Sequence, residues 1–359
     1  MTGGPRLAFI DFLKCFGMVL IVYGHAAGWA PLATFPPVYL KQLGVAFFLF
    51  ALGYSLARED RPISEVLFAR LFDIYVFGLI VCVLLSAYFL ARSGRWAPSN
   101  YLPYFAGVNV FLDQFPANPT TWYVGTYIHF LLLWAFLLRK VRIRPLILLG
   151  VLAGEVAARA MILRYAGNFI AYMTVPNWIT VFLLGYYASQ RRVVTVPGPL
   201  WLWAGGLVVC GYGWFTIASH APLLHTFPLM RPIDPGFTSL LMLSCAISAL
   251  YLGSTWFAFA LFSKAPPVAF VTFIARNTVI IFIAHMPIVF GLLQVLPNTP
   301  EATIWRSAVL MLVSLPGLAM VSHVVRQSPV LSWSRGWLRD RFVPGAAASE
   351  QGVPVTHDR

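Results

Sequence analysis

Apolar runs of about 20 residues recur along almost the whole of this 359-residue chain. Hydrophobic residues make up 59% of the sequence and charged residues only 10%, whereas about 25% of a soluble domain is charged. An α-helix of about 20 apolar residues crosses a bilayer, because it satisfies its own backbone hydrogen bonds in a solvent that offers none. The pattern therefore predicts an all-α, polytopic membrane protein.

The apolar runs divide into about ten spanning helices in one bundle. Their expected ranges are 7–29, 38–57, 66–91, 122–138, 145–164, 175–189, 198–219, 237–258, 268–293 and 305–325. Lysine and arginine concentrate in cytoplasmic loops, and with the N-terminus inside 15 of them fall on the inner side and 5 on the outer side. We therefore expect both termini to be cytoplasmic.

The chain has room for one integral-membrane domain, expected over residues 1–341, and a small, polar tail at 342–359 that we expect to be disordered. The first apolar run does not end in a small-residue cleavage site, which favours a retained anchor over a cleaved signal. The expected location is a bacterial cytoplasmic (inner) membrane.

Composition excludes several functional classes. The net charge of +13 does not predict a nucleic-acid partner, because the basic residues lie at helix ends rather than on one soluble face. The four cysteines fall within apolar segments and are expected to be buried hydrophobes rather than disulfides or metal ligands. Phosphate-binding loops, zinc-protease motifs and serine-hydrolase elbows are missing from the sequence, so neither nucleotide hydrolysis nor a zinc mechanism is expected.

The first apolar segment, 7–29, carries three ionisable residues on one stripe. Lys14 and His25 are separated by eleven positions, which places them within about 20° of one helix face and about 16 Å apart along the axis. Asp11 falls within about 60° of both. Such groups do not face lipid, so they predict a polar cavity or pathway inside the bundle.

His25 is the strongest catalytic candidate, because an imidazole accepts a proton near neutral pH. The alternative is a histidine hydrogen-bonded at the outer interface, since its helix is almost finished there. Lys14 either pairs structurally with Asp11 or meets an anionic part of a substrate.

A second intramembrane histidine, His285, precedes Pro287 in the segment 268–293, with Asn277 near the same face. Its alternative role is a hydrogen bond to a neighbouring helix beside the proline kink. Arg70 and Asp73 stand three residues apart at the inner end of the third segment, where they can pair or where Arg70 can meet a phosphate.

Glu155 and Arg159 stand four residues apart near mid-membrane. Their spacing favours a structural ion pair, and a substrate contact is the alternative.

The order of these motifs resembles a known family. Asp11-Phe-Leu-Lys14 followed by Val-Tyr-Gly-His25 resembles the first helix of the integral-membrane acyltransferase 3 family. The aromatic-rich run at 46–54, which ends in Gly-Tyr, resembles the second helix of that family.

Three later segments resemble the family as well. Trp122 and the tyrosine after it resemble the Trp-Phe/Tyr start of one family helix, and the segment 182–186 resembles a Phe-x-x-Gly-Tyr pattern. The segment 277–287 resembles a late Ser-x-x-x-Tyr-x-x-His-x-Pro motif, with the serine and the tyrosine replaced. The sequence of the first motif most resembles the sugar or fucose O-acetyltransferase branch of the family. The matches extend from residue 7 to about 325.

The resemblance implies transfer of an acyl group, commonly acetyl, from acyl-CoA to a hydroxyl of a sugar, glycolipid or other envelope molecule. The implied partners are acyl-CoA as co-substrate, a carbohydrate or lipid-linked acceptor and membrane lipids, with no permanently bound cofactor. The family often has Arg-x-x-Arg in its third helix, whereas this chain has Arg70 and then Asp73. Arg58, Arg61 or Lys14 could compensate for the missing arginine.

The residues proposed for the chemistry are His25 as general base, with Lys14, Asp11 and His285. The proposed substrate-binding residues are Arg70, Arg58, Arg61, Asn277, Trp122, Glu155 and Arg159. Two other functions fit part of the pattern. A proton-coupled transporter or flippase would use the same intramembrane charges as a relay, and a membrane scaffold or sensor would need no turnover.

Overall fold

The computed structural model describes residues 7–27, 40–219, 236–297, 299 and 303–343. Within these ranges the protein is helical and contains no strand, which confirms the all-α prediction. Seven of the described helices are long and apolar enough to cross a membrane, and a bent pair counts as an eighth if it is one span. The number ten and the cytoplasmic termini stay predictions.

The helices follow the expected apolar runs closely. The long ones are α1 (Ala8–Ala27), α2 (Lys41–Leu56), α3 (Ile63–Ser93), α6 (Trp122–Leu133, continued by a π-helical turn at Trp134–Leu138), α7 (Pro145–Tyr165), α9 (Ile179–Gln190), α10 (Leu200–Ser219), α11 (Phe237–Phe262), α12 (Ala269–Arg276), α13 (Thr278–Leu293), α14 (Thr303–Leu312), α15 (Leu318–Arg326) and α16 (Pro329–Phe342). The loop after α3 holds the short helices α4 (Tyr101–Phe105) and α5 (Asn109–Leu112), and α8 (Asn168–Met173) precedes α9.

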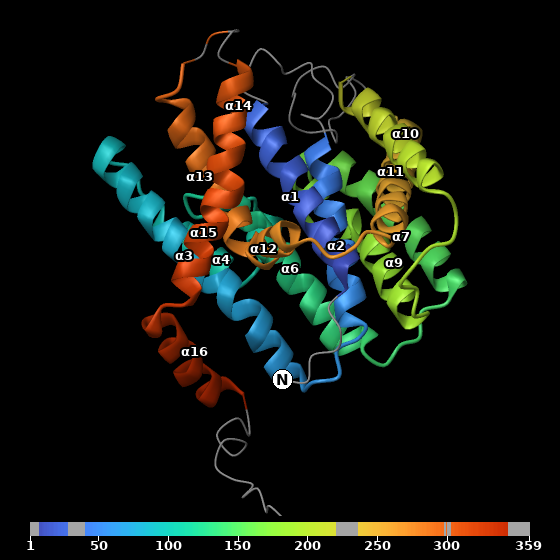
Figure 1. Ribbon diagram of the computed structural model, residues 1–359, viewed down its shortest axis with the longest axis horizontal. Coiled ribbons are helices and arrows are strands. Elements are labelled where there is room, and N and C mark those ends of the chain that lie inside the picture. The colour runs from blue at the N-terminus through green and yellow to red at the C-terminus, as the bar shows by residue number, and fades with distance from the viewer. Residues whose placement is uncertain (1–6, 28–39, 220–235, 298, 300–302, 344–359) are drawn as a thin grey trace, which may run out of the picture.

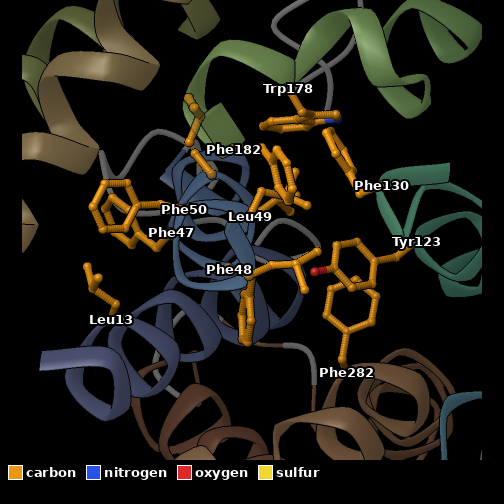
Figure 2. Packing of buried hydrophobic residues seen from close by; sticks show 14 of the residues in the cluster. Leu13, Phe47, Phe48, Leu49, Phe50, Tyr123, Phe130, Trp178, Phe182 and Phe282 are labelled. Atoms are coloured by element: carbon orange, nitrogen blue, oxygen red, sulfur yellow. The ribbon is translucent and has the colours of Figure 1, made fainter. Parts of the chain in front are cut away.

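The short helix α2 lies at the centre of the bundle, between α1 and α9 (Figure 1). It is apolar on all sides, as expected for a helix surrounded by protein, and all but one of its residues are buried. Glycines allow the close contact with α9, because a Cβ on Gly53 would overlap the carbonyl oxygen of Phe182 and one on Gly185 would overlap that of Phe50. Aromatic side chains fill the space around this contact (Figure 2).

The segment expected as one helix at 268–293 is instead two, and this expectation was wrong. Helices α12 and α13 meet at Asn277 with a bend of 74°, and in Figure 1 α12 runs across the bundle. The Asn277 amide donates to the Phe273 carbonyl at 2.8 Å and accepts from the Ser322 hydroxyl at 2.6 Å. These polar contacts compensate for a break that would be costly in lipid.

The chain after α15 forms a further helix that the apolar pattern did not predict. Helix α16 lies against α3 (Figure 1), and its Arg335 forms an ion pair with Asp73. It ends at Phe342, one residue inside the expected tail, and residues 344–359 of that tail lie outside the described residues.

Candidate functional site

Three neighbouring cavities follow α1 through the bundle. We call them the basal cavity, of about 400 Å³, the central cavity, of about 90 Å³, and the histidine cavity, of about 340 Å³. The basal and central cavities share Lys14, Arg70, Tyr127, Thr278 and Val279 in their walls. The polar residues that define the basal cavity are Asp11, Lys14, Arg70, Asp73, Arg276, Thr278 and Arg326. Those that define the histidine cavity are His25, Lys41, Gln42, Asp113, Thr120, Trp122, Tyr172 and His285.

The histidine cavity brings together the two intramembrane histidines singled out in the sequence. The rings of His25 on α1 and His285 on α13 have centroids 5.2 Å apart, with an angle of 47° between their planes. No described group forms a hydrogen bond with the His25 ring, which is partly exposed and lines the cavity. A histidine that lines a cavity rather than facing lipid can be reached by a substrate, which a general base requires.

His285 is completely buried, and its orientation is fixed by its own helix. Its Nδ1 lies 2.7 Å from the carbonyl oxygen of Phe282 and 3.2 Å from that of Ile281. Since a carbonyl only accepts, Nδ1 carries the hydrogen and Nε2 holds the free lone pair. Nε2 is buried with no hydrogen-bond partner in the described parts of the chain, so it is left to bind a proton donor.

Two residues at helix starts complete the polar wall of the histidine cavity. Trp122, a predicted site residue, begins α6, while Lys41, which the sequence analysis did not single out, begins α2. Lys41 is only 8% exposed. A signal was present in the sequence, since Lys41 and Gln42 are a strongly polar pair near the start of an otherwise apolar run.

The basal cavity is rich in cations. Lys14, Arg70, Arg276 and Arg326 line it together with two acids. One of these acids, Asp11, accepts a hydrogen bond of 3.0 Å from the Thr272 hydroxyl. The positive excess favours an anionic ligand.

The second acid, Asp73, pairs with arginines from the C-terminal part of the chain. It forms ion pairs with Arg326, at 3.2 Å, and with Arg335. Arg70 does not pair with Asp73, as its spacing allowed, but approaches Glu59 at 3.8 Å. Asp73 thus stands where the resemblance led us to expect an arginine, and it holds Arg326 beside the same cavity.

An aromatic wall separates the central and histidine cavities. Phe282 lines both of them, and its ring centroid is 4.7 Å from that of Tyr123 and 6.4 Å from that of Phe48. The three side chains converge from α13, α6 and α2 (Figure 2). These rings lie between the two cavities.

Arg58, Arg61 and Asn277 do not line any of the three cavities. Arg61 forms a bidentate pair with Glu59 at 2.7 and 2.8 Å, and this contact lowers the pKa of the Glu59 carboxyl below its usual value. Arg58 is exposed, and Asn277 stabilises the break between α12 and α13.

Glu155 and Arg159 form a buried hydrogen-bond network away from the cavities. Arg159 donates to Glu155 at 2.6 Å and to the Asn177 carbonyl at 2.9 Å. The Glu155 carboxylate also accepts from the Ser248 hydroxyl at 2.6 Å and the Thr180 amide at 2.8 Å. This arrangement fits the structural alternative, because the carboxylate is already bonded on both oxygens.

Residues 7–323 match the family model Acyl_transf_3, described as an acyltransferase domain. Searches of curated proteins and of solved structures found no significant similarity.

Proposed function

The chain belongs to the acyltransferase 3 family, and on that premise we propose that it is a membrane-bound O-acyltransferase with acyl-CoA as donor. The acceptor in this proposal is a hydroxyl of a sugar, glycolipid or other envelope molecule, and the acyl group is acetyl. One observation carries it: an imidazole pair lines the cavity at one end of a row of three neighbouring cavities, and four cations line the cavity at the other end.

The basal cavity is the proposed donor site. Coenzyme A carries several phosphate charges, and guanidinium groups bind phosphate through paired, charge-assisted hydrogen bonds. Arg70, Arg276 and Arg326 supply three such groups, with the Lys14 ammonium deeper in the same wall. The positive-inside count supports a cytoplasmic position for this cavity, on the side where acyl-CoA is made.

The histidine cavity is the proposed acceptor site. It lies about 16 Å from Lys14 along the axis of α1, so the donor's flexible thiol arm must enter the central cavity to bring its thioester near. The aromatic wall of Phe282 and Tyr123 keeps the two sites apart until both substrates are bound. This separation limits loss of the thioester to water.

The proposed chemistry is direct transfer. The His25 imidazole takes the proton of the acceptor hydroxyl as its oxygen attacks the thioester carbonyl carbon. A new C–O ester bond forms, the C–S bond breaks, and the CoA sulfur leaves with the proton returned by the imidazolium. The free Nε2 of His285 accepts a hydrogen bond from a hydroxyl or a water and helps to orient it.

Cysteine placement supports a path without an acyl-enzyme. Cys15, Cys82, Cys210 and Cys245 are absent from the walls of the three described cavities. A covalent route through a thiol would need a cysteine within reach of a base and of the thioester.

The test uses the full chain in lipid nanodiscs with acetyl-labelled acetyl-CoA. We expect wild-type protein to release or transfer the label and His25→Ala to lose at least about a hundredfold of this rate, since a positioned base contributes about 10²–10⁴. His323→Ala is the matched control, because His323 is exposed and outside the cavities. Normal turnover by a folded His25→Ala variant would contradict the assignment of the base.

The same preparation separates the enzyme from a transporter. In sealed liposomes a proton-coupled transporter would move a substrate along a pH gradient without consuming acetyl-CoA. Gradient-driven uptake together with an intact thioester would contradict acyl transfer, and the intramembrane charges would then form a relay.

A further inference from the structure

Resting on the proposed acyl transfer, we propose that the acceptor bears an anionic group, a carboxylate or a phosphate, that binds Lys41 in the histidine cavity. The inference starts from the position of this ammonium group. Lys41 lies in the first turn of α2, lines the same cavity as both histidines and is 92% shielded from solvent, being 8% exposed.

Lys41 has no counter-ion in the described structure. No carboxylate of the described chain lies within 4 Å of its ammonium, and no hydrogen bond from it is formed there. A shielded charge without a partner is costly, and proteins keep such a group where a ligand supplies the partner. A lysine that merely ended a spanning helix would extend its ammonium into the interface water instead.

The other groups around the cavity reinforce its positive character. His25 and His285 face Lys41, and the one acid in the described wall, Asp113, is exposed at the rim and does not pair with it. The N-terminal amides of the 16-residue helix α2 also point their positive end toward the cavity. An anion bound to Lys41 would therefore meet favourable charge from several directions.

The position of Lys41 relates an anion bound there to the proposed reaction. Lys41 and the histidine pair share one cavity of about 340 Å³, which is near the lower end of small-molecule sites. A single acceptor molecule can place its anion on Lys41 and a hydroxyl on His25 at the same time. Lys41 is thus a specificity-determining residue that selects charged acceptors and orients their hydroxyl group.

Three matched probes test this inference. They are methyl β-glucuronide, methyl β-glucoside 6-phosphate and neutral methyl β-glucoside, which differ at one carbon. Their dissociation constants are measured by equilibrium dialysis against the full chain in nanodiscs, and their acetylation by labelled acetyl-CoA is followed in parallel. Comparison of the two anions distinguishes a carboxylate site from a phosphate site.

We expect at least one anionic probe to bind about tenfold more tightly than the neutral one, as for a charge-assisted hydrogen bond. Lys41→Met should reduce this ratio to about one, Lys41→Arg should retain most of it, and Lys140→Met, at an exposed loop lysine, should leave it unchanged. The ratio is internal to each preparation, so differences in yield do not affect it.

Two results would overturn the inference: equal binding of the three probes, or an anion preference that survives in Lys41→Met. If the proposed acyl transfer itself is wrong, the result differs from these two. Acetyl-CoA would then stay intact with every probe, while dialysis would still report the ratio of dissociation constants.

Discussion

At the scale of single residues, the buried polar groups fall into two kinds. Glu155 and Arg159 are completely buried, and each bonds several protein atoms. Nε2 of His285 is buried without a partner in the described chain, and Lys41, which is 8% exposed, forms no ion pair there. A group that the fold has satisfied stabilises the fold, whereas one left open next to a cavity is available to a substrate. This distinction assigns roles that residue type alone did not.

We therefore expect Glu155→Gln and Arg159→Met to act on stability. Each leaves a buried charge without its partner, which costs about 3–5 kcal/mol. The melting temperature in detergent should fall for each single variant and recover in part in the double variant. The acceptor KM of the folded fraction should stay near the wild-type value. An unchanged melting temperature with a raised KM would instead support the substrate-binding alternative.

At the scale of elements, helix α2 forms part of the wall of the histidine cavity. It is wedged between α1 and α9, and its first turn carries Lys41. Its axial position relative to α9 is fixed where the backbones touch, at Gly53 and Gly185. Contacts this close leave no room for a shift, so the location of Lys41 depends on small residues far from the cavity.

Gly185→Ala should accordingly destabilise the bundle. The added Cβ overlaps the Phe50 backbone carbonyl, which cannot move without shifting α2, and overpacking of this kind costs about 1–3 kcal/mol. Gly154→Ala on α7 is the matched control, since a Cβ there meets no atom within 4 Å and alanine is the better helix former. Thermal unfolding of the two variants measures the difference. Equal melting temperatures would show that α2 and α9 can separate at little cost.

At the scale of the whole molecule, the bundle keeps two chemically different sites at opposite ends of α1. The broken helix contributes to both, because Arg276 at the end of α12 lines the basal cavity and His285 on α13 lines the histidine cavity. Under the proposed function, donor and acceptor would arrive from different sides of the membrane and meet at the aromatic wall around Phe282.

Cysteine labelling tests this arrangement. In a background without the four native cysteines, a membrane-impermeant maleimide should reach Asp113→Cys from the outer side and Arg276→Cys only in inverted vesicles. Both positions are exposed and lie at the rims of different cavities. Labelling of both from one side would contradict a passage that crosses the bilayer.

Much of the fold and part of the site could be predicted from local pattern. Apolar runs specify membrane helices because bilayer and backbone allow few alternatives, so the all-α class and most helix ranges were confirmed. Helical spacing indicated that His25 lines an interior cavity. The family resemblance was confirmed over residues 7–323.

The tertiary structure alone decided which polar groups were satisfied. The bend at Asn277 depends on a hydrogen bond from Ser322, and Asp73 pairs with Arg326 and Arg335. The isolation of Lys41 depends on which side chains of α1 and α13 lie near it. These contacts join residues 45 or more positions apart. A membrane sequence specifies where each helix lies along the chain, but a buried charge is stabilised or left open by neighbours that only packing supplies.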